Sequence, residues 1–161
     1  MNMKPNIKWK PLLIALALPL AAGGFSAFLT RDGMKAFAAL KQPPLSPPAW
    51  LFPVVWTILY LMMGLASYLV WVSGVSPRRR ERALTVYGLS LAANFLWPIL
   101  FFTVQAWLGA LILLLVLWVL VGITALLFGA VSPRAGRLMV PYLLWLTFAA
   151  YLNLGVWLLN R

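Results

Sequence analysis

The chain alternates between long stretches without a charged residue and short basic segments. The uncharged stretches cover residues 11–30, 42–77, 83–133 and 138–160. A membrane-spanning helix needs roughly 20 apolar residues, so three of these stretches hold one helix each. The third stretch is long enough for two, with a turn near its most polar point, Gln105 and Ala106. We therefore predict five membrane helices, at about residues 11–29, 49–73, 81–104, 107–130 and 139–158, with residues 30–48 as a first loop.

A proline-rich segment in this first loop leads directly into the second predicted helix. Pro43, Pro44, Pro47 and Pro48 fix φ and remove amide donors, so this segment is not helical. Such a stiff loop is suited to cover a pocket as a lid, although prolines are also common just before a membrane helix. The lid residues would be Phe37, Leu45 and Trp50. Apolar residues at three-residue spacing predict a short interfacial helix over residues 31–40.

Composition places the chain in a bilayer. Of its 161 residues, 64% are hydrophobic and 9% are charged, whereas about a quarter of a typical soluble domain is charged. The predicted fold class is all-α: one polytopic membrane domain over residues 1–161, built as a five-transmembrane-helix bundle. The basic start and apolar run also resemble a secretory signal, but the first helix is long enough to span the membrane.

The net charge of +11 comes from basic residues that flank the predicted helices. No nucleic-acid motif accompanies them, so the expected partner is the lipid bilayer and not a nucleic acid. With five spans, the N-terminal tail shares a side with the second and fourth loops. That side carries nine basic residues: Lys4, Lys8, Lys10, Arg78, Arg79, Arg80, Arg82, Arg134 and Arg137. The other side carries four: Arg31, Lys35, Lys41 and Arg161. The positive-inside rule then predicts a cytoplasmic N-terminus, with a bacterial cytoplasmic membrane favoured.

The chain contains no cysteine and no histidine. This excludes disulfides, thiolate nucleophiles, imidazole bases and metal sites built on these ligands. The two carboxylates, Asp32 and Glu81, are expected in loops on opposite sides of the membrane, too far apart for an acid–base pair. No acid or base lies within a predicted span, which argues against ion-coupled transport. We expect no metal and no obligatory cofactor.

One face of the third predicted helix combines aromatic and polar groups. Asn94, Trp97 and Phe101 share this face, and Pro98 lacks the N–H that would bond the carbonyl of Asn94. A polar side chain and a freed carbonyl thus meet inside the membrane, where unsatisfied polar groups are costly. Either a neighbouring helix or water satisfies them, or they face a ligand, and the residues leave both interpretations open.

Aromatic and small residues share faces on other helices. Trp56 and Tyr60 lie four apart on one face, and Trp145 beside Ala149 leaves a notch for a flat ligand or for a neighbouring side chain. The candidate ligand-binding residues are Trp56, Tyr60, Asn94, Trp97, Phe101, Trp107, Ala110, Leu114, Trp145, Ala149 and Leu152. Small residues on the first helix, among them Gly23 and Ser26, suit close helix contact.

The sequence resembles the tryptophan-rich sensory protein/translocator protein family (TspO/MBR), which includes the peripheral benzodiazepine receptor. The matching blocks are PPAWLFPVVWTILYLMMG at 47–64, NFLWPILFF at 94–102 and SPRAGRLMVPYLLWLTFAAYLN at 132–153. The likeness covers nearly the whole chain and is weakest in the first helix. It implies a five-helix membrane bundle, often a homodimer, with a pocket inside the bundle under the first loop.

The resemblance also implies ligands. Members bind tetrapyrroles such as protoporphyrin IX, synthetic isoquinoline-carboxamides and benzodiazepines, and some bind cholesterol. Matching pocket positions here are Trp56, Asn94, Trp97, Trp107, Ala110, Leu114, Trp145, Ala149 and Leu152. Indole stacking would supply contact to a flat porphyrin. We further hypothesise that Arg31, Lys35 or Lys41 pairs with its propionates at the rim.

The first loop and the last helix depart from the family pattern. Ala36 and Phe37 occupy the positions of a Trp-Tyr pair, and Leu45 that of a loop tryptophan. Tryptophans that would cover a porphyrin are therefore missing. The tyrosine and arginine positions of the weak cholesterol-recognition pattern hold Leu154, Gly155 and Leu158. We do not expect high-affinity sterol binding at this segment.

Three functions compete at this point. The first is a membrane receptor or carrier for tetrapyrroles and related flat apolar ligands, with a transport or stress-sensory role. The alternative is an enzyme that degrades porphyrin in light, with Trp56 and Trp145 as redox partners, although the missing loop tryptophans count against it. The third is an efflux or scaffold protein of another kind, and the lack of membrane-buried carboxylates weighs against proton-coupled efflux.

Overall fold

The computed structural model describes residues 7–161; Lys4 lies outside this range. The described chain forms five long helices: α1 (Trp9–Phe37), α2 (Leu51–Trp71), α3 (Pro77–Pro98), α4 (Trp107–Val131) and α5 (Pro133–Asn160). A π-helical segment, η1 (Ile99–Thr103), continues α3. Each of the five spans, with η1 counted in the third, is long and apolar enough to cross a membrane. The predicted all-α membrane bundle of five helices is confirmed.

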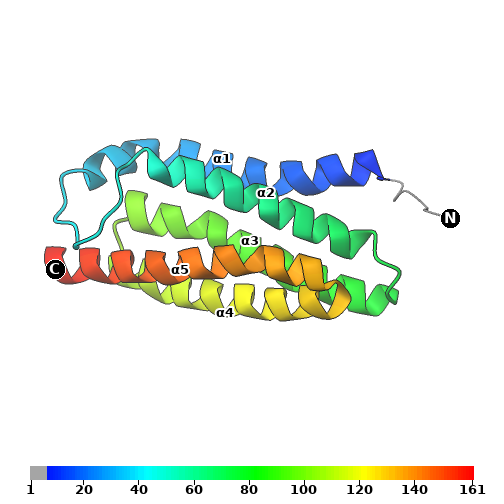
Figure 1. Cartoon of the computed structure of the whole chain (residues 1–161). Coiled ribbons are helices and arrows are strands. Elements are labelled where there is room, and N and C mark those ends of the chain that lie inside the picture. Colours follow the sequence, from blue (N-terminus) through cyan, green and yellow to red (C-terminus); the bar gives the residue numbers. More distant parts are fainter. Residues whose placement is uncertain (1–6) are drawn as a thin grey trace.

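The helices lie side by side, and the start of α1 and the end of α5 lie at opposite ends of the bundle (Figure 1). Their most extensive contacts form a ring in which α1 packs on α2, α2 on α5, α5 on α4, α4 on α3, and α3 with η1 on α1. Met63, Phe128 and Tyr142 are fully buried between them, whereas large apolar residues such as Leu126 and Leu144 face outward. Lipid tails solvate such an apolar exterior without cost.

α1 is longer than predicted. It runs unbroken to Phe37, so the expected interfacial helix over residues 31–40 is in fact mostly the C-terminal end of α1. No proline stops the helix between Pro19 and Pro43, and the hydroxyl of Thr30 donates back to the carbonyl of Ser26 at 3.0 Å. The first loop is correspondingly shorter and covers residues 38–50.

Two charged segments that were predicted as loops are helical. α3 begins at Pro77 and α5 at Pro133, because proline suits the first helical position, where its missing N–H costs nothing. Glu81 and the arginines beside it therefore lie in α3, and Asp32 lies in α1. The two carboxylates are nevertheless at opposite ends of the bundle, as predicted (Figure 1).

The connection between α4 and α5 is a single residue, Ser132. The prediction of a loop over residues 132–138 is therefore wrong. A side chain could not fit at this corner: a Cβ at Gly136 would lie 2.6 Å from the Cα of Gly129. The paired glycines let the two helices approach closely and turn back tightly.

The third span changes character at Pro98. α3 ends there, because proline cannot donate to the carbonyl four residues earlier. The chain continues as η1, with the wider i→i+5 hydrogen bonding of a π-helix, as in the 2.9 Å bond from the Val104 amide to the Ile99 carbonyl. A positive φ at Gln105 then turns the chain into α4 at the predicted place.

A candidate ligand-binding cavity

A cavity of about 360 Å³ opens inside the bundle beneath the first loop. Its lining comes from α1, the first loop, α2, the end of α3 with η1, and α5. Small-molecule sites commonly have volumes of about 300–1,000 Å³. The cavity is therefore large enough for an organic ligand, and it lies where the family resemblance implied a pocket.

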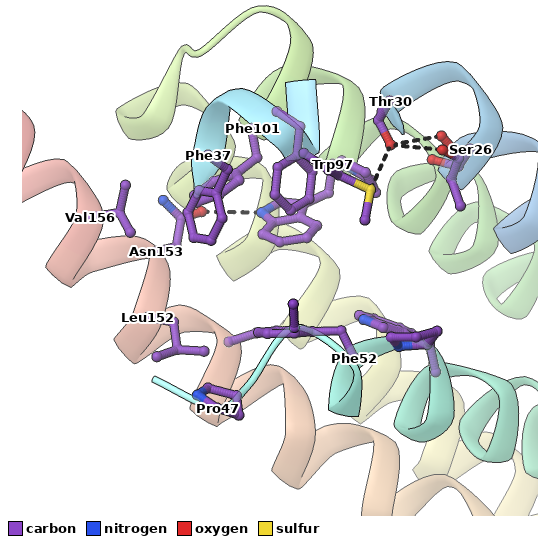
Figure 2. A pocket seen from close by; sticks show the side chains of 18 of the residues that line it. Ser26, Thr30, Phe37, Pro47, Phe52, Trp97, Phe101, Leu152, Asn153 and Val156 are labelled. Carbon is purple, nitrogen blue, oxygen red and sulfur yellow. Dashed lines mark hydrogen bonds between the residues drawn. The ribbon is translucent and has the colours of Figure 1, made fainter. Parts of the chain in front are cut away.

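Figure 2 shows two walls facing each other across this space. Phe37, Trp97 and Phe101 form one wall, and Phe52 and Pro47 lie opposite. Leu152 of α5 closes one side. The two walls come from segments far apart in the sequence, so the cavity exists only in the folded bundle.

The aromatic side chains of the walls support one another. Trp97 stacks on Phe101 with ring centroids 5.1 Å apart, and Phe37 meets Phe101 at 5.5 Å. On the α2 side, Trp56 stacks on Tyr60 at 5.5 Å. Such pairs contribute about 0.5–1.5 kcal/mol each beyond burial. The pairs hold the rings in fixed orientations and so preform the surfaces that a planar ligand would contact.

Both the oxygen and the nitrogen of the Asn94 side chain are hydrogen-bonded to protein groups. Its carbonyl oxygen accepts from the Tyr60 hydroxyl at 2.9 Å, and its amide nitrogen donates to the Tyr142 hydroxyl at 2.7 Å. The residue is only 4% exposed. Neighbouring helices therefore supply partners for the side chain, while its ligand-facing role stays a prediction, because Asn94 also lines the cavity. Asn94 borders the cavity and orients Tyr60 there.

A second asparagine, Asn153 of α5, fixes the wall formed by Phe37, Trp97 and Phe101. Its side-chain oxygen accepts from the indole N–H of Trp97 at 3.1 Å (Figure 2), and its amide donates to the Trp107 carbonyl at 2.9 Å. This side chain therefore links three elements: α3, the start of α4, and α5. The bond to Trp97 fixes the ring orientation, because an indole has only one donor.

Among residues 7–161, none of those that line the cavity is charged. Arg31 and Lys35 pair instead with Asp32 on the outer surface of α1, at 3.9 and 3.2 Å. Lys41 is tied through its backbone: its amide donates to the Asn160 side-chain oxygen at 3.0 Å, and its carbonyl accepts from the Asn160 amide at 2.8 Å. The hypothesis that one of these cations holds a propionate gains no support from their positions.

The first loop is docked on α5. The Tyr151 hydroxyl donates to the Pro44 carbonyl at 2.7 Å. Pro43 lies directly against Gly155, where a Cβ would come within 2.6 Å of the proline Cγ. Glycine is thus required at 155 by this close approach, which gives a structural reason for one departure from the sterol-recognition pattern.

Most predicted site residues line the cavity. Those that do are Phe37, Trp56, Tyr60, Asn94, Trp97, Phe101, Trp145, Ala149 and Leu152. Those that do not are Leu45, Trp50, Trp107, Ala110 and Leu114. Phe101 and Val156 shield the start of α4 from the cavity, so Trp107 and Ala110 pack behind them and Leu114 belongs to the bundle core. Leu45 and Trp50 are 83% and 65% exposed and face outward.

The cavity is also lined by residues that were not among the predicted site residues, several of them in α1. The additional lining includes Gly23, Ser26, Thr30, Met34, Pro47, Phe52, Phe102, Asn153 and Val156. The small α1 residues were interpreted as a packing face, and Gly23 does pack against the Tyr60 ring. Ser26 also donates to the Phe95 carbonyl at 3.0 Å. Two signals could have identified members of this set: Pro47 belongs to the loop that was predicted as a lid, and Asn153 shares a helical face with Trp145 and Ala149.

Comparisons with known proteins agree with this architecture. A sequence profile of the TspO/MBR family matches residues 15–158. The chain is 36% identical to the tryptophan-rich protein TspO of Chlorobaculum tepidum, over 98% of this chain and 99% of that protein. It is 37% identical to the translocator protein of Bos taurus, over 95% and 92% of the two chains. It is 36% identical to the tryptophan-rich sensory protein of Cereibacter sphaeroides, over 96% and 94%.

Proposed function

This chain belongs to the TspO/MBR family, and from that premise we propose that it is a membrane receptor or carrier for tetrapyrroles of the protoporphyrin IX type and for related flat, apolar ligands. One observation carries the proposal: an uncharged cavity with aromatic walls lies inside a membrane bundle beneath a docked loop. The names of the relatives, translocator protein and sensory protein, suit a transport or a stress-sensory role for such binding.

The chemistry of the cavity favours planar ligands. Trp56 and Trp145 border it from different helices, and Phe52 packs edge-on against Trp145 at 6.0 Å. Because the side chains of Asn94 and Asn153 are already bonded within the protein, recognition rests on shape and stacking more than on new hydrogen bonds. Stacking contributes about 0.5–1.5 kcal/mol per aromatic pair beyond burial, so two indoles add an appreciable part of the affinity.

A titration with protoporphyrin IX in the dark tests binding. Purified protein in detergent is titrated, and binding is read from the porphyrin absorption band. Removing two stacking partners by combining Trp56→Leu with Trp145→Leu should weaken binding about tenfold. Trp118→Leu is the matched control, because Trp118 bonds Thr147 on the outer surface at 2.9 Å. Absence of saturable binding in the wild type, or equal losses in both variants, would reject the proposal.

The dimethyl ester of protoporphyrin IX provides a second test, of how the ligand is recognised. The lining holds no cation to pair with a propionate. We therefore expect the diester to bind within about threefold of the free acid. If a cation did contact a propionate, esterification would remove a hydrogen bond to a charged group and cost about 1.5–3 kcal/mol. A loss of tenfold or more would instead place a cation at the ligand and revive Arg31, Lys35 or Lys41 as candidates.

The photochemical alternative has one supporting observation, because two oxidisable indoles, Trp56 and Trp145, line the cavity. Illumination of the saturated complex distinguishes the functions. Loss of the porphyrin spectrum only in light, and only with both tryptophans present, identifies an enzyme. A stable spectrum identifies a binder, and porphyrin uptake into vesicles then separates a carrier from a receptor.

We further propose a cytoplasmic membrane with the N-terminus in the cytoplasm. Lys8 and Lys10, the arginines of α3 and those of α5 all lie at the N-terminal end of the bundle. Since the chain has no native cysteine, single exposed cysteines at Ser76 and Leu45 report the orientation. An impermeant maleimide added to intact cells should label Leu45→Cys and leave Ser76→Cys unlabelled, and the opposite pattern contradicts the assignment.

A further inference from the structure

A second groove, of about 460 Å³, lies on the outer surface between α2 and α5. It is lined by Leu65, Leu69, Arg134, Arg137 and Leu138. This groove belongs to the end of the bundle where α2 finishes and α5 starts, opposite the ligand cavity under the first loop (Figure 1). The two sites share no residue.

The lining combines basic side chains of α5 with apolar side chains of both helices. Arg134 is at the start of α5, and Leu138 follows one turn deeper into the bundle. On α2, Leu69 lies near the C-terminal end and Leu65 one turn deeper. Arg137 directly precedes Leu138, so the groove sets two basic side chains beside three leucines at the end of the bundle where α2 finishes and α5 starts.

The basic part is not neutralised by the protein. Within residues 7–161, neither Arg134 nor Arg137 has a carboxylate within ion-pair distance. Glu81 is the one acidic residue that the described chain places at this end, among at least eight lysines and arginines. Arg80 is already engaged, 5.4 Å above the ring of Trp71. The two α5 arginines therefore present unpaired guanidinium groups at the mouth of an apolar groove.

We propose that this groove holds an anionic phospholipid of the surrounding bilayer. Arg134 and Arg137 bind its phosphate, because guanidinium groups match phosphate oxygens in geometry and charge. One acyl chain lies along Leu65, Leu69 and Leu138. A net negative headgroup is required, since the two guanidinium groups that line the groove have no carboxylate beside them within residues 7–161 and favour an anionic lipid over a zwitterionic one. A free anion would make no contact with the three leucines that form the apolar wall of the groove.

Lipid retention tests the proposal. The full-length protein is placed in nanodiscs with equal amounts of phosphatidylglycerol and phosphatidylcholine, and the lipids retained after extraction are counted by native mass spectrometry. The wild type should retain an excess of phosphatidylglycerol. Combining Arg134→Gln with Arg137→Gln should reduce that excess roughly 10- to 30-fold, as expected for two basic residues at a membrane surface. Combining Arg78→Gln with Arg79→Gln removes the same charge from α3 and should leave the excess nearly unchanged.

A third variant tests the apolar wall. Leu65→Trp fills the groove without altering any charge and should also reduce retained phosphatidylglycerol, while its Tm in detergent shows that the fold is intact. The proposal is overturned by equal losses in the two arginine pairs, by equal retention of both lipids, or by no effect of Leu65→Trp. Displacement of phosphatidylglycerol by millimolar inorganic phosphate would likewise overturn it, because it would identify a simple anion site.

Discussion

Replacing Gly33 with alanine tests whether α1 positions the aromatic wall of the cavity. Gly33 lies in the last part of α1, directly against the backbone of η1. A Cβ at this position would come within 2.6 Å of the carbonyl carbon of Phe102 and 3.1 Å of the amide nitrogen of Thr103. The atoms that would have to move are backbone atoms, so no side-chain rotation relieves the contact.

The expected cost follows from this geometry. Such atoms normally approach no closer than about 3.4 Å, so α1 and η1 must separate by about 0.8 Å at the Phe102 carbonyl carbon. Overpacking of this kind costs about 1–3 kcal/mol. Alanine also favours a helix over glycine by up to about 1 kcal/mol. Gly24→Ala is the matched control, because a Cβ at Gly24 meets nothing within 4 Å. The helix gain is the same in both variants and cancels in the comparison.

Thermal unfolding in detergent measures the difference. About 1–3 kcal/mol corresponds to a Tm for Gly33→Ala that is roughly 2–12 °C below that of Gly24→Ala, at about 2–4 °C per kcal/mol for a chain of this size. Porphyrin affinity should fall as well, because η1 carries Phe101 and Phe102 into the cavity lining. If Gly33→Ala is as stable as Gly24→Ala, the close packing of α1 on η1 does not hold in solution and the reasoning fails.

Three further substitutions probe the polar links and the loop. Asn94→Leu removes the shared partner of two buried tyrosine hydroxyls, so the Tm should fall by the equivalent of about 1–3 kcal/mol; an unchanged Tm contradicts this. Asn160→Ala removes both hydrogen bonds to the backbone of Lys41. The dissociation rate of porphyrin, measured by stopped flow, should therefore rise about 2- to 10-fold. An unchanged rate would mean that this link does not hold the loop. Leu45 has a positive φ of 66°, which glycine adopts without strain. Leu45→Gly should therefore raise the Tm by the equivalent of up to about 1 kcal/mol. A lower Tm would count against strain at this residue.

The spans and many of the site faces were predictable because lipid leaves few alternatives. A chain in a bilayer must satisfy its backbone hydrogen bonds within helices, so uncharged length counts the spans directly. Helical spacing then places Trp97 beside Asn94, and Trp145 beside Ala149, whatever the neighbouring helices are. All four residues line the cavity.

Helical spacing alone could not show which helices face each other across the cavity. Trp107, Ala110 and Leu114 form a regular stripe, but α4 has no direct packing contact with α1 in the described chain and is screened by η1 and α5. Conversely, Ser26 and Thr30 look like packing residues until the fold sets α1 beside η1. The starts of α3 and α5 were also missed, because the basic residues after Pro77 and Pro133 were assigned to loops, whereas these prolines begin helices.

The structure also changes the meaning of the missing loop tryptophans. Leu45, at one of those positions, is 83% exposed. Its positive φ follows Pro44, an arrangement typical of a type II turn that carries the side chain away from the cavity. An indole at this position would therefore not cover a ligand in this conformation.

The roof of the cavity consists of small and rigid groups instead. Pro43 and Pro47 line it, with Ser46 held by a 2.7 Å bond to the Pro43 carbonyl. These groups offer little stacking surface, whereas the walls carry Trp56 and Trp145. The two parts therefore have separable effects: the walls determine how tightly a planar ligand binds, and the loop with its links to α5 determines how fast the ligand enters and leaves. Substitutions in the loop should change the association and dissociation rates together and leave the equilibrium constant nearly unchanged, while substitutions in the walls should change the equilibrium constant.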